Sequence, residues 1–136
     1  MAQPNIVNVA NIYAQSVGFN LSNTLTATLF TVATDKVLKV NNIMCSNVDG
    51  SNAASINLFV DKAEFTTNDG TVGPFSTNIT VDGNFYIAKV ITVAPNSTLV
   101  LLESPIYLME GDALKGGASA ASDLDLIVSY ELLNDA

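Results

Sequence analysis

Few residues in this sequence could carry catalysis or bind a metal, and two acidic residues near its C-terminal end are the first candidates. Asp123 and Asp125 flank Leu124, so a strand here would place both carboxylates on one face. Paired carboxylates can bind Ca²⁺ or act in glycoside cleavage. No third acidic residue stands at the spacing of an EF-hand loop, so the pair is better explained as the polar junction between a loop and a strand.

The segment from Gly111 to Gly116 superficially resembles a phosphate-binding loop. It has neither the Gly-Lys-Ser/Thr ending nor a following helical pattern, so a nucleotide site is not expected. No serine lies in a Gly-x-Ser-x-Gly motif, and the chain has no histidine that could act as a base for a serine nucleophile. The sequence therefore predicts no catalytic residue, no cofactor and no enzymatic activity.

The charge balance excludes further classes of protein. The 136 residues include 13 Asp and Glu but only 5 Lys and Arg, all of them Lys, which gives a net charge of -8. Without arginine there are no bidentate clamps for phosphate, and an acidic surface repels a nucleic-acid backbone. We therefore expect no nucleic-acid partner.

The single cysteine and the N-terminal residues indicate whether the chain forms disulfides and whether it is exported. Cys45 stands alone in the apolar run 43–45, which predicts a small buried hydrophobic residue and excludes an internal disulfide. Residues 1–5 lack the basic and apolar regions of a secretory signal, so we expect synthesis in the cytoplasm without export. No stretch approaches the ~20 apolar residues that cross a bilayer, so we expect no membrane partner.

Short runs with period-two alternation, separated by turn residues, predict strands along most of the chain. Asn41-Asn42 interrupts one run, which predicts a bulge or a strand that changes sheets. The Asp49-Gly50 turn predicts that the runs on either side of it pair with each other. Residues 62–75 are predicted to form a long connection, a kind of segment that often binds partners. The predicted strands are residues 25–32, 37–45, 54–60, 77–81, 85–93, 98–102, 106–109 and 124–133. Residues 113–118 are a further short segment that precedes the last of these strands.

Seven to nine short strands without helical segments predict one all-β domain, an antiparallel β-sandwich that is jelly-roll-like. We assign residues 17–136 to this sandwich. Residues 1–16 are either its first strand or an extended arm that adds to the sheet of a neighbouring subunit.

The surface composition favours assembly with other proteins. Charged residues make up 13% of the chain, below the roughly 25% of average soluble domains, while Asn, Ser and Thr dominate the outward positions. Contacts are expected from the apolar residues of segments 1–16 and 62–75. The candidate interface residues are Ile6, Val7, Val9, Ile12, Tyr13, Phe65 and Phe75.

Several segments together resemble a recurrent small β-sandwich of tailed-phage virion proteins. The shared order is a strand that leads through a short turn into a long strand, then a hairpin, a Pro95-Asn96-Ser97 turn and a Gly111-Asp112 turn before the closing strand. The resemblance covers about residues 24–133. It is carried by residues 29–43, 55–60, 94–99, 108–114 and 126–130.

This resemblance implies a structural role in a bacteriophage virion, first of all as a capsid decoration (cement) protein that clamps neighbouring copies of the major capsid protein. It implies no catalytic residue. The alternative is a neck, tail or tail-fibre component, including a glycan- or receptor-binding module at the tip of a tail. We expect a homo-oligomer, for which a trimer would suit the threefold positions of an icosahedral shell.

Overall fold

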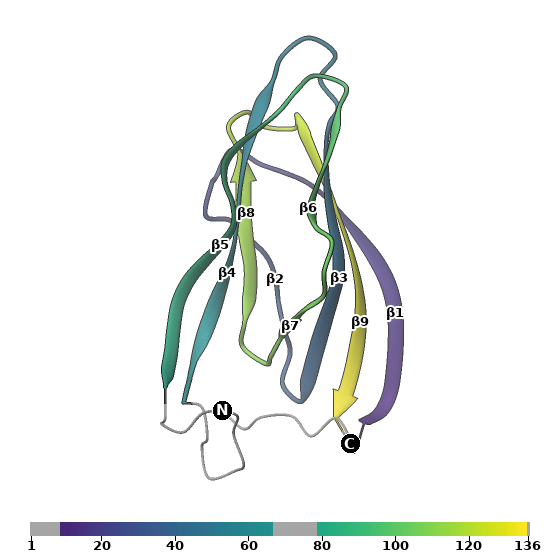
Figure 1. The fold of residues 1–136 in the computed structure, drawn as a ribbon, viewed down its shortest axis with the longest axis vertical. Coiled ribbons are helices and arrows are strands. Elements are labelled where there is room, and N and C mark those ends of the chain that lie inside the picture. The colour runs from purple at the N-terminus through teal and green to yellow at the C-terminus, as the bar shows by residue number, and fades with distance from the viewer. Residues whose placement is uncertain (1–8, 67–78, 136) are drawn as a thin grey trace.

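Nine β-strands in two sheets form the regular structure of residues 9–66 and 79–135, which are the residues that this computed structural model describes (Figure 1). All the pairings between these strands are antiparallel. The described residues include no helix. The prediction of an all-β antiparallel sandwich is therefore confirmed.

The first sheet has the strand order β1-β9-β3-β6, and β7 pairs with β3 along the same edge as β6. The second sheet has the order β2-β8-β4-β5. The strands of the first sheet are β1 (Val9–Asn20), β3 (Lys36–Asn47), β6 (Thr98–Leu102), β7 (Ile106–Leu108) and β9 (Leu124–Asp135). Those of the second are β2 (Thr28–Thr31), β4 (Ala54–Thr66), β5 (Thr80–Val93) and β8 (Ala113–Ala118).

The pairings are nested in the order of a jelly roll. The first strand pairs with the last, β2 with β8, β3 with β6 and β7, and β4 with β5. The chain thus behaves as one long hairpin folded over into two layers, with β6 and β7 as two pieces of one interrupted strand. Most neighbours in each sheet are consequently far apart in the sequence.

The core lies between the two sheets and contains the alternate residues that the strand pattern predicts. Ile56, Leu58 and Val60 of β4 point into it and are buried, as expected. Phe59, on the other face of β4, is also buried, where its ring packs against Tyr86 at 5.0 Å between centroids. The deepest remaining core residues are Leu21, Val40, Ile43, Cys45, Leu108, Leu114, Ala118, Leu124, Leu126 and Val128.

The predicted pairing across the Asp49-Gly50 turn is wrong. β3 belongs to the first sheet and β4 to the second, so the turn carries the chain from one layer to the other. Asn47 is buried at this crossing, where its side-chain amide donates to the carbonyls of Asn52 and Val93, both at 2.9 Å. Turn residues signal a reversal of direction, but they do not specify which strand becomes the partner.

The long connection predicted for residues 62–75 is wrong at its beginning, because β4 continues to Thr66. Residues 67–75 lie outside the described residues. The strands predicted at 77–81 and 85–93 are one strand, β5, from Thr80 onward. Its bends at Gly83, with a φ of 114°, and Val90, with a φ of 53°, break the alternation that a sequence pattern detects.

The predicted interruption at Asn41-Asn42 is confirmed as a bulge. The register between β3 and β9 shifts between Val40 and Asn42, so the strand continues on both sides of the irregularity. The bulge lets one long strand pair with β7 before it and with β6 after it.

Residues 9–16 form the first half of β1 and pair with β9 of the same chain, so this part of the N-terminal segment is the first strand of the sandwich. The expected boundary between residues 16 and 17 falls inside that strand. Residues 1–8 lie outside the described residues.

Candidate interaction surface

Of the seven candidate interface residues, four lie in strands β1 and β4 and three lie outside the described residues. Ile12 and Tyr13 are consecutive residues of β1 that point to opposite faces of the first sheet, and they are 64% and 55% exposed. Val9 and Phe65 belong to strands β1 and β4. Ile6, Val7 and Phe75 lie outside the described residues. The structure therefore shows that two of the candidate residues, Ile12 and Tyr13, are exposed, and both belong to β1.

Strand β1 forms a border of the first sheet (Figure 1). It pairs with β9 along one side, and no described strand pairs with its other side. Its twelve residues include no charged residue and no proline. Such an edge presents backbone N–H and C=O groups to any further strand that approaches it.

An apolar cleft of about 470 Å³ opens between β1 and β2, where the two sheets separate. Phe19 and Phe30 stack across it, with ring centroids 6.2 Å apart. At its rim the Lys36 ammonium donates to the Asn134 side chain at 2.6 Å. The cleft is also lined by Val17, Leu29, Thr31, Val32, Ala33, Leu38, Tyr130 and Leu132.

The outer face of the first sheet is almost uncharged. Hydroxyl pairs cross it, one between Ser16 and Ser129 at 3.0 Å and another between Ser46 and Thr98 at 2.8 Å. The register also places Ile12 beside Leu133 and Ile127 beside Met44 on this face. As far as Asn134 of β9, the charged residues that the register places there are Lys39, Glu131 and Asp125, of which Lys39 and Glu131 form an ion pair at 3.6 Å.

A shallower groove of about 350 Å³ lies on the opposite side of the sandwich, between β5 and β7. Its aromatic residues Phe85, Tyr86 and Tyr107 are each about half exposed. The Lys89 ammonium lies 5.1 Å from the centre of the Tyr86 ring. Rings held in this way can pack against an apolar segment or against the flat face of a sugar.

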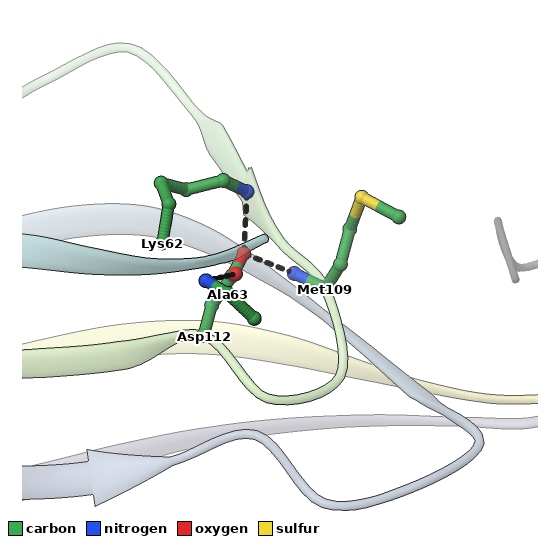
Figure 2. Close-up of polar contacts among 4 residues, drawn as sticks. All are labelled: Lys62, Ala63, Met109 and Asp112. Atoms are coloured by element: carbon green, nitrogen blue, oxygen red, sulfur yellow. Dashed lines mark hydrogen bonds and ion pairs between the residues drawn. The ribbon is translucent and has the colours of Figure 1, made fainter. Parts of the chain in front are cut away.

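Among the described residues Asp112 is the most deeply buried acidic group, and its contacts account for both carboxylate oxygens (Figure 2). Oδ1 accepts the backbone N–H of Ala63 at 2.9 Å. Oδ2 accepts the N–H of Met109 at 2.8 Å and pairs with the Lys62 ammonium at 2.5 Å. Because all these partners belong to β4 or to the turn after β7, Asp112 acts as a structural link between the two rather than as a free acid.

Asp123 and Asp125 do not meet a third acidic group. Asp125 accepts a hydrogen bond from the Asn20 side chain at 2.7 Å. The backbone carbonyl of Asp123 accepts the N–H of Val48 at 2.8 Å. Within residues 9–66 and 79–135 no group of three or more Asp, Glu, His or Cys could hold a metal ion.

Cys45 is buried in the core, as predicted. Burial raises the pKa of its thiol to about 11, and the nearby Asp125 carboxylate adds to the rise. The thiol is therefore protonated at neutral pH and poorly reactive.

The sequence interpretation missed both the cleft and the Asp112 link. Leu29 and Phe30 belong to β2 and Tyr130 belongs to β9. These two strands are far apart in the chain, so no local spacing in the sequence indicates that the three residues line one cleft. An aspartate after a glycine is typical of an exposed turn, and acidic residues are seldom fully buried. The uncharged character of β1, in contrast, is visible in its sequence.

The sequence and the structure were compared with known proteins, and no match was found. No family model matches the sequence, no curated protein matches it, and no solved structure matches the fold. Among the described residues there is also no helix of the length and apolar character needed to span a membrane. The likeness to phage virion proteins therefore stays an expectation from the sequence.

Proposed function

We propose that this chain is a structural subunit of a tailed-phage virion, in the first place a capsid decoration protein that stabilises the shell through protein-protein contacts. The observation that carries the proposal is the uncharged border and the almost uncharged outer face of the first sheet, in a chain whose net charge is -8. Strands β1, β6 and β7 contain no charged residue at all. A protein that stayed dispersed as single molecules would be expected to carry charge on such a face.

The fold is compatible with this role without deciding it. Jelly rolls serve as capsid subunits and also as lectin domains, so function has to come from the surface. A decoration subunit needs only a modest contact with each neighbour, because many copies on one shell add their contacts together. The partners would be the major capsid protein, other virion proteins and further copies of this chain.

A glycan- or receptor-binding module at a tail tip is the second candidate. The groove between β5 and β7 favours it, because Tyr86 and Tyr107 present exposed rings there. The lining of this groove is mainly apolar, whereas sugar sites need several polar partners for hydroxyl groups. The groove is therefore better suited to an apolar protein segment than to a sugar.

The copy number and position of this chain in purified particles test the proposal. Mass spectrometry should find it in stoichiometric amounts relative to the major capsid protein, and electron microscopy should place the copies at symmetry-related sites on the shell. A few copies at the tail tip, together with binding to cells or glycans, would favour the second candidate. Particles without the chain would contradict both.

A further inference from the structure

Three borders of the two sheets carry features that discourage another strand from pairing with them. β2 has only four residues. The border formed by β6 and β7 is interrupted by Glu103 and Pro105. β5 bears charges at Asp82 and Lys89 and bends next to both of them. Short length, charge, proline and bulges are the usual means by which proteins prevent association between sheet edges.

The fourth border, β1, has none of these features along its regular part. Its register with β9 is continuous from Asn11 to Asn20, and the one irregularity precedes this stretch. No residue of β1 is charged, and the side chains from Asn11 to Ser16 are all exposed. A long, regular and neutral edge is the arrangement that accepts a further strand.

The net charge of the chain indicates which part of a second copy can approach the β1 edge. Two copies of a chain with a charge of -8 repel each other unless they meet through a neutral surface. β1 is such a surface. Its partner in the sheet, β9, brings Glu131 and Asp125 near the edge. Glu131 is paired with Lys39, and Asp125 accepts a hydrogen bond from the Asn20 side chain.

We propose that β1 pairs in antiparallel fashion with β1 of a second copy, which joins the two first sheets into one continuous sheet. This deepens the proposed function, because it names one contact through which the subunits assemble. The contact is isologous and closes as a dimer, so a trimer on the shell would need a different face.

The register of this pairing follows from the two faces of the strand. Residues that stand directly opposite each other in a sheet point to the same face, so each residue must pair with one an even number of positions away. The twofold axis that relates the two copies therefore passes where one residue of β1 stands opposite the same residue of the second copy. Pairing is longest over residues 11–20 when that residue is Gln15 or Ser16.

Either register also gives Tyr13 a partner. Tyr13 is paired with Leu132, and Val17 with Val128, so both point to the core side of the sheet, although Tyr13 is 55% exposed. An axis at Gln15 places Tyr13 of one copy opposite Val17 of the other, and an axis at Ser16 places it opposite Phe19. Val17 and Phe19 both line the apolar cleft, so the Tyr13 ring of each copy would cover the mouth of the other copy's cleft.

Cysteine cross-linking of the full chain tests the register. Opposed side chains in a sheet have Cβ atoms about 4.5 to 5.5 Å apart, close enough for a disulfide after small adjustments. We expect either Gln15→Cys or Ser16→Cys to form a disulfide-linked dimer under mild oxidation. Thr92→Cys, on the exposed part of β5, is the control and should stay monomeric in denaturing gels, and native Cys45 is buried and should not contribute.

The affinity of the dimer tests the role of Tyr13. Ile91 is an exposed apolar residue of β5 that lines neither the cleft nor the groove, so Ile91→Ala is the control for Tyr13→Ala. We expect Tyr13→Ala to raise the dimer dissociation constant at least tenfold in sedimentation experiments, and Ile91→Ala to leave it unchanged. Circular dichroism should show that both variants keep their β structure.

The outcomes separate this inference from the proposed function. If the chain decorates particles but neither β1 cysteine cross-links and Tyr13→Ala assembles normally, the pairing of β1 is overturned while the proposed function stands. If β1 cross-links as expected but purified particles lack the chain, the pairing stands and the virion role is overturned.

Discussion

Lys62 and Asp112 lie 50 residues apart in the sequence and form a partly buried ion pair of 2.5 Å, in which the Asp112 side chain is fully buried. The pair joins β4 of the second sheet to the turn through which the chain passes from β7 into β8. The backbone of the same turn is also bonded to the end of β2, because Val32 donates to the carbonyl of Asp112 at 2.9 Å. One aspartate thus connects three segments of the fold.

Replacing this aspartate should destabilise the protein strongly. Asp112→Ala removes the carboxylate that the Lys62 ammonium and two backbone N–H groups contact, and breaking one side of a buried ion pair costs about 3 to 5 kcal/mol. The measurement is the free energy of unfolding in urea. Glu131→Gln removes the partly exposed partner of Lys39 and should cost at most about 1 kcal/mol. Equal losses in the two variants would show that the buried link has no special weight.

Two glycines of β8 should not tolerate a side chain. A Cβ atom at Gly116 would overlap the backbone carbonyl oxygen of Asn57, and one at Gly117 would overlap that of Thr24. We expect Gly116→Ala to lower the free energy of unfolding by about 1 to 3 kcal/mol or more, because the backbone has to move. A Cβ at Gly18 would lie at an ordinary 3.9 Å from its nearest neighbour, so Gly18→Ala should be neutral or slightly stabilising. Thermal unfolding of both variants measures the difference.

The crossing from β3 to β4 should depend on the Asn47 side chain. Its Oδ1 also accepts the N–H of Asp49 at 2.9 Å, so Asn47→Ala removes one buried and two partly buried hydrogen bonds to backbone groups. Each buried polar group left unpaired costs about 1 to 3 kcal/mol, so we expect a loss of at least about 2 kcal/mol in urea unfolding. Asn84→Ala, at an exposed position of β5, is the control. An unchanged midpoint for Asn47→Ala would contradict the assigned role.

Stability at alkaline pH should reflect the buried thiol of Cys45. Its pKa is about 11 in the folded protein against 9.0 for an ordinary thiol, so between these values the unfolded state releases the proton and the folded state keeps it. Rising pH therefore favours unfolding in this range, and this contribution to stability is lost progressively above pH 9. The decline from pH 9 to 11 should be steeper for the wild type than for Cys45→Ala. Parallel curves would exclude the shift in pKa.

The local part of the fold could be predicted from the sequence, because alternation and turn residues are local signals. The shared face of Ile56, Leu58 and Val60 and the interruption at Asn41-Asn42 were both predicted correctly, and the structure decides between the two explanations of the interruption in favour of a bulge. The partner of β4 was not, because the Asp49-Gly50 turn fits a hairpin and a crossing between sheets equally well. Pairing in a jelly roll is decided by contacts between distant strands, which a single sequence does not display.

The candidate surface could be predicted only in part for the same reason. Ile12 and Tyr13 are candidate interface residues from the sequence because they are apolar and belong to segment 1–16, which departs from the regular sandwich pattern. That they lie on a free sheet border beside an apolar cleft depends on the pairing of β1 with β9 and on the position of Phe30 in β2. Lys62, in turn, was assigned to a connection because nothing nearby in the sequence indicates its partner Asp112.

Sedimentation of the purified full chain over a wide range of concentration tests the central claim most directly, because a building block must bind other copies or its shell. We predict a species larger than the 14.3 kDa monomer that dissociates on dilution and that carries more than one copy onto each binding site of a purified particle. A monomer at every concentration that also fails to bind particles would contradict the account.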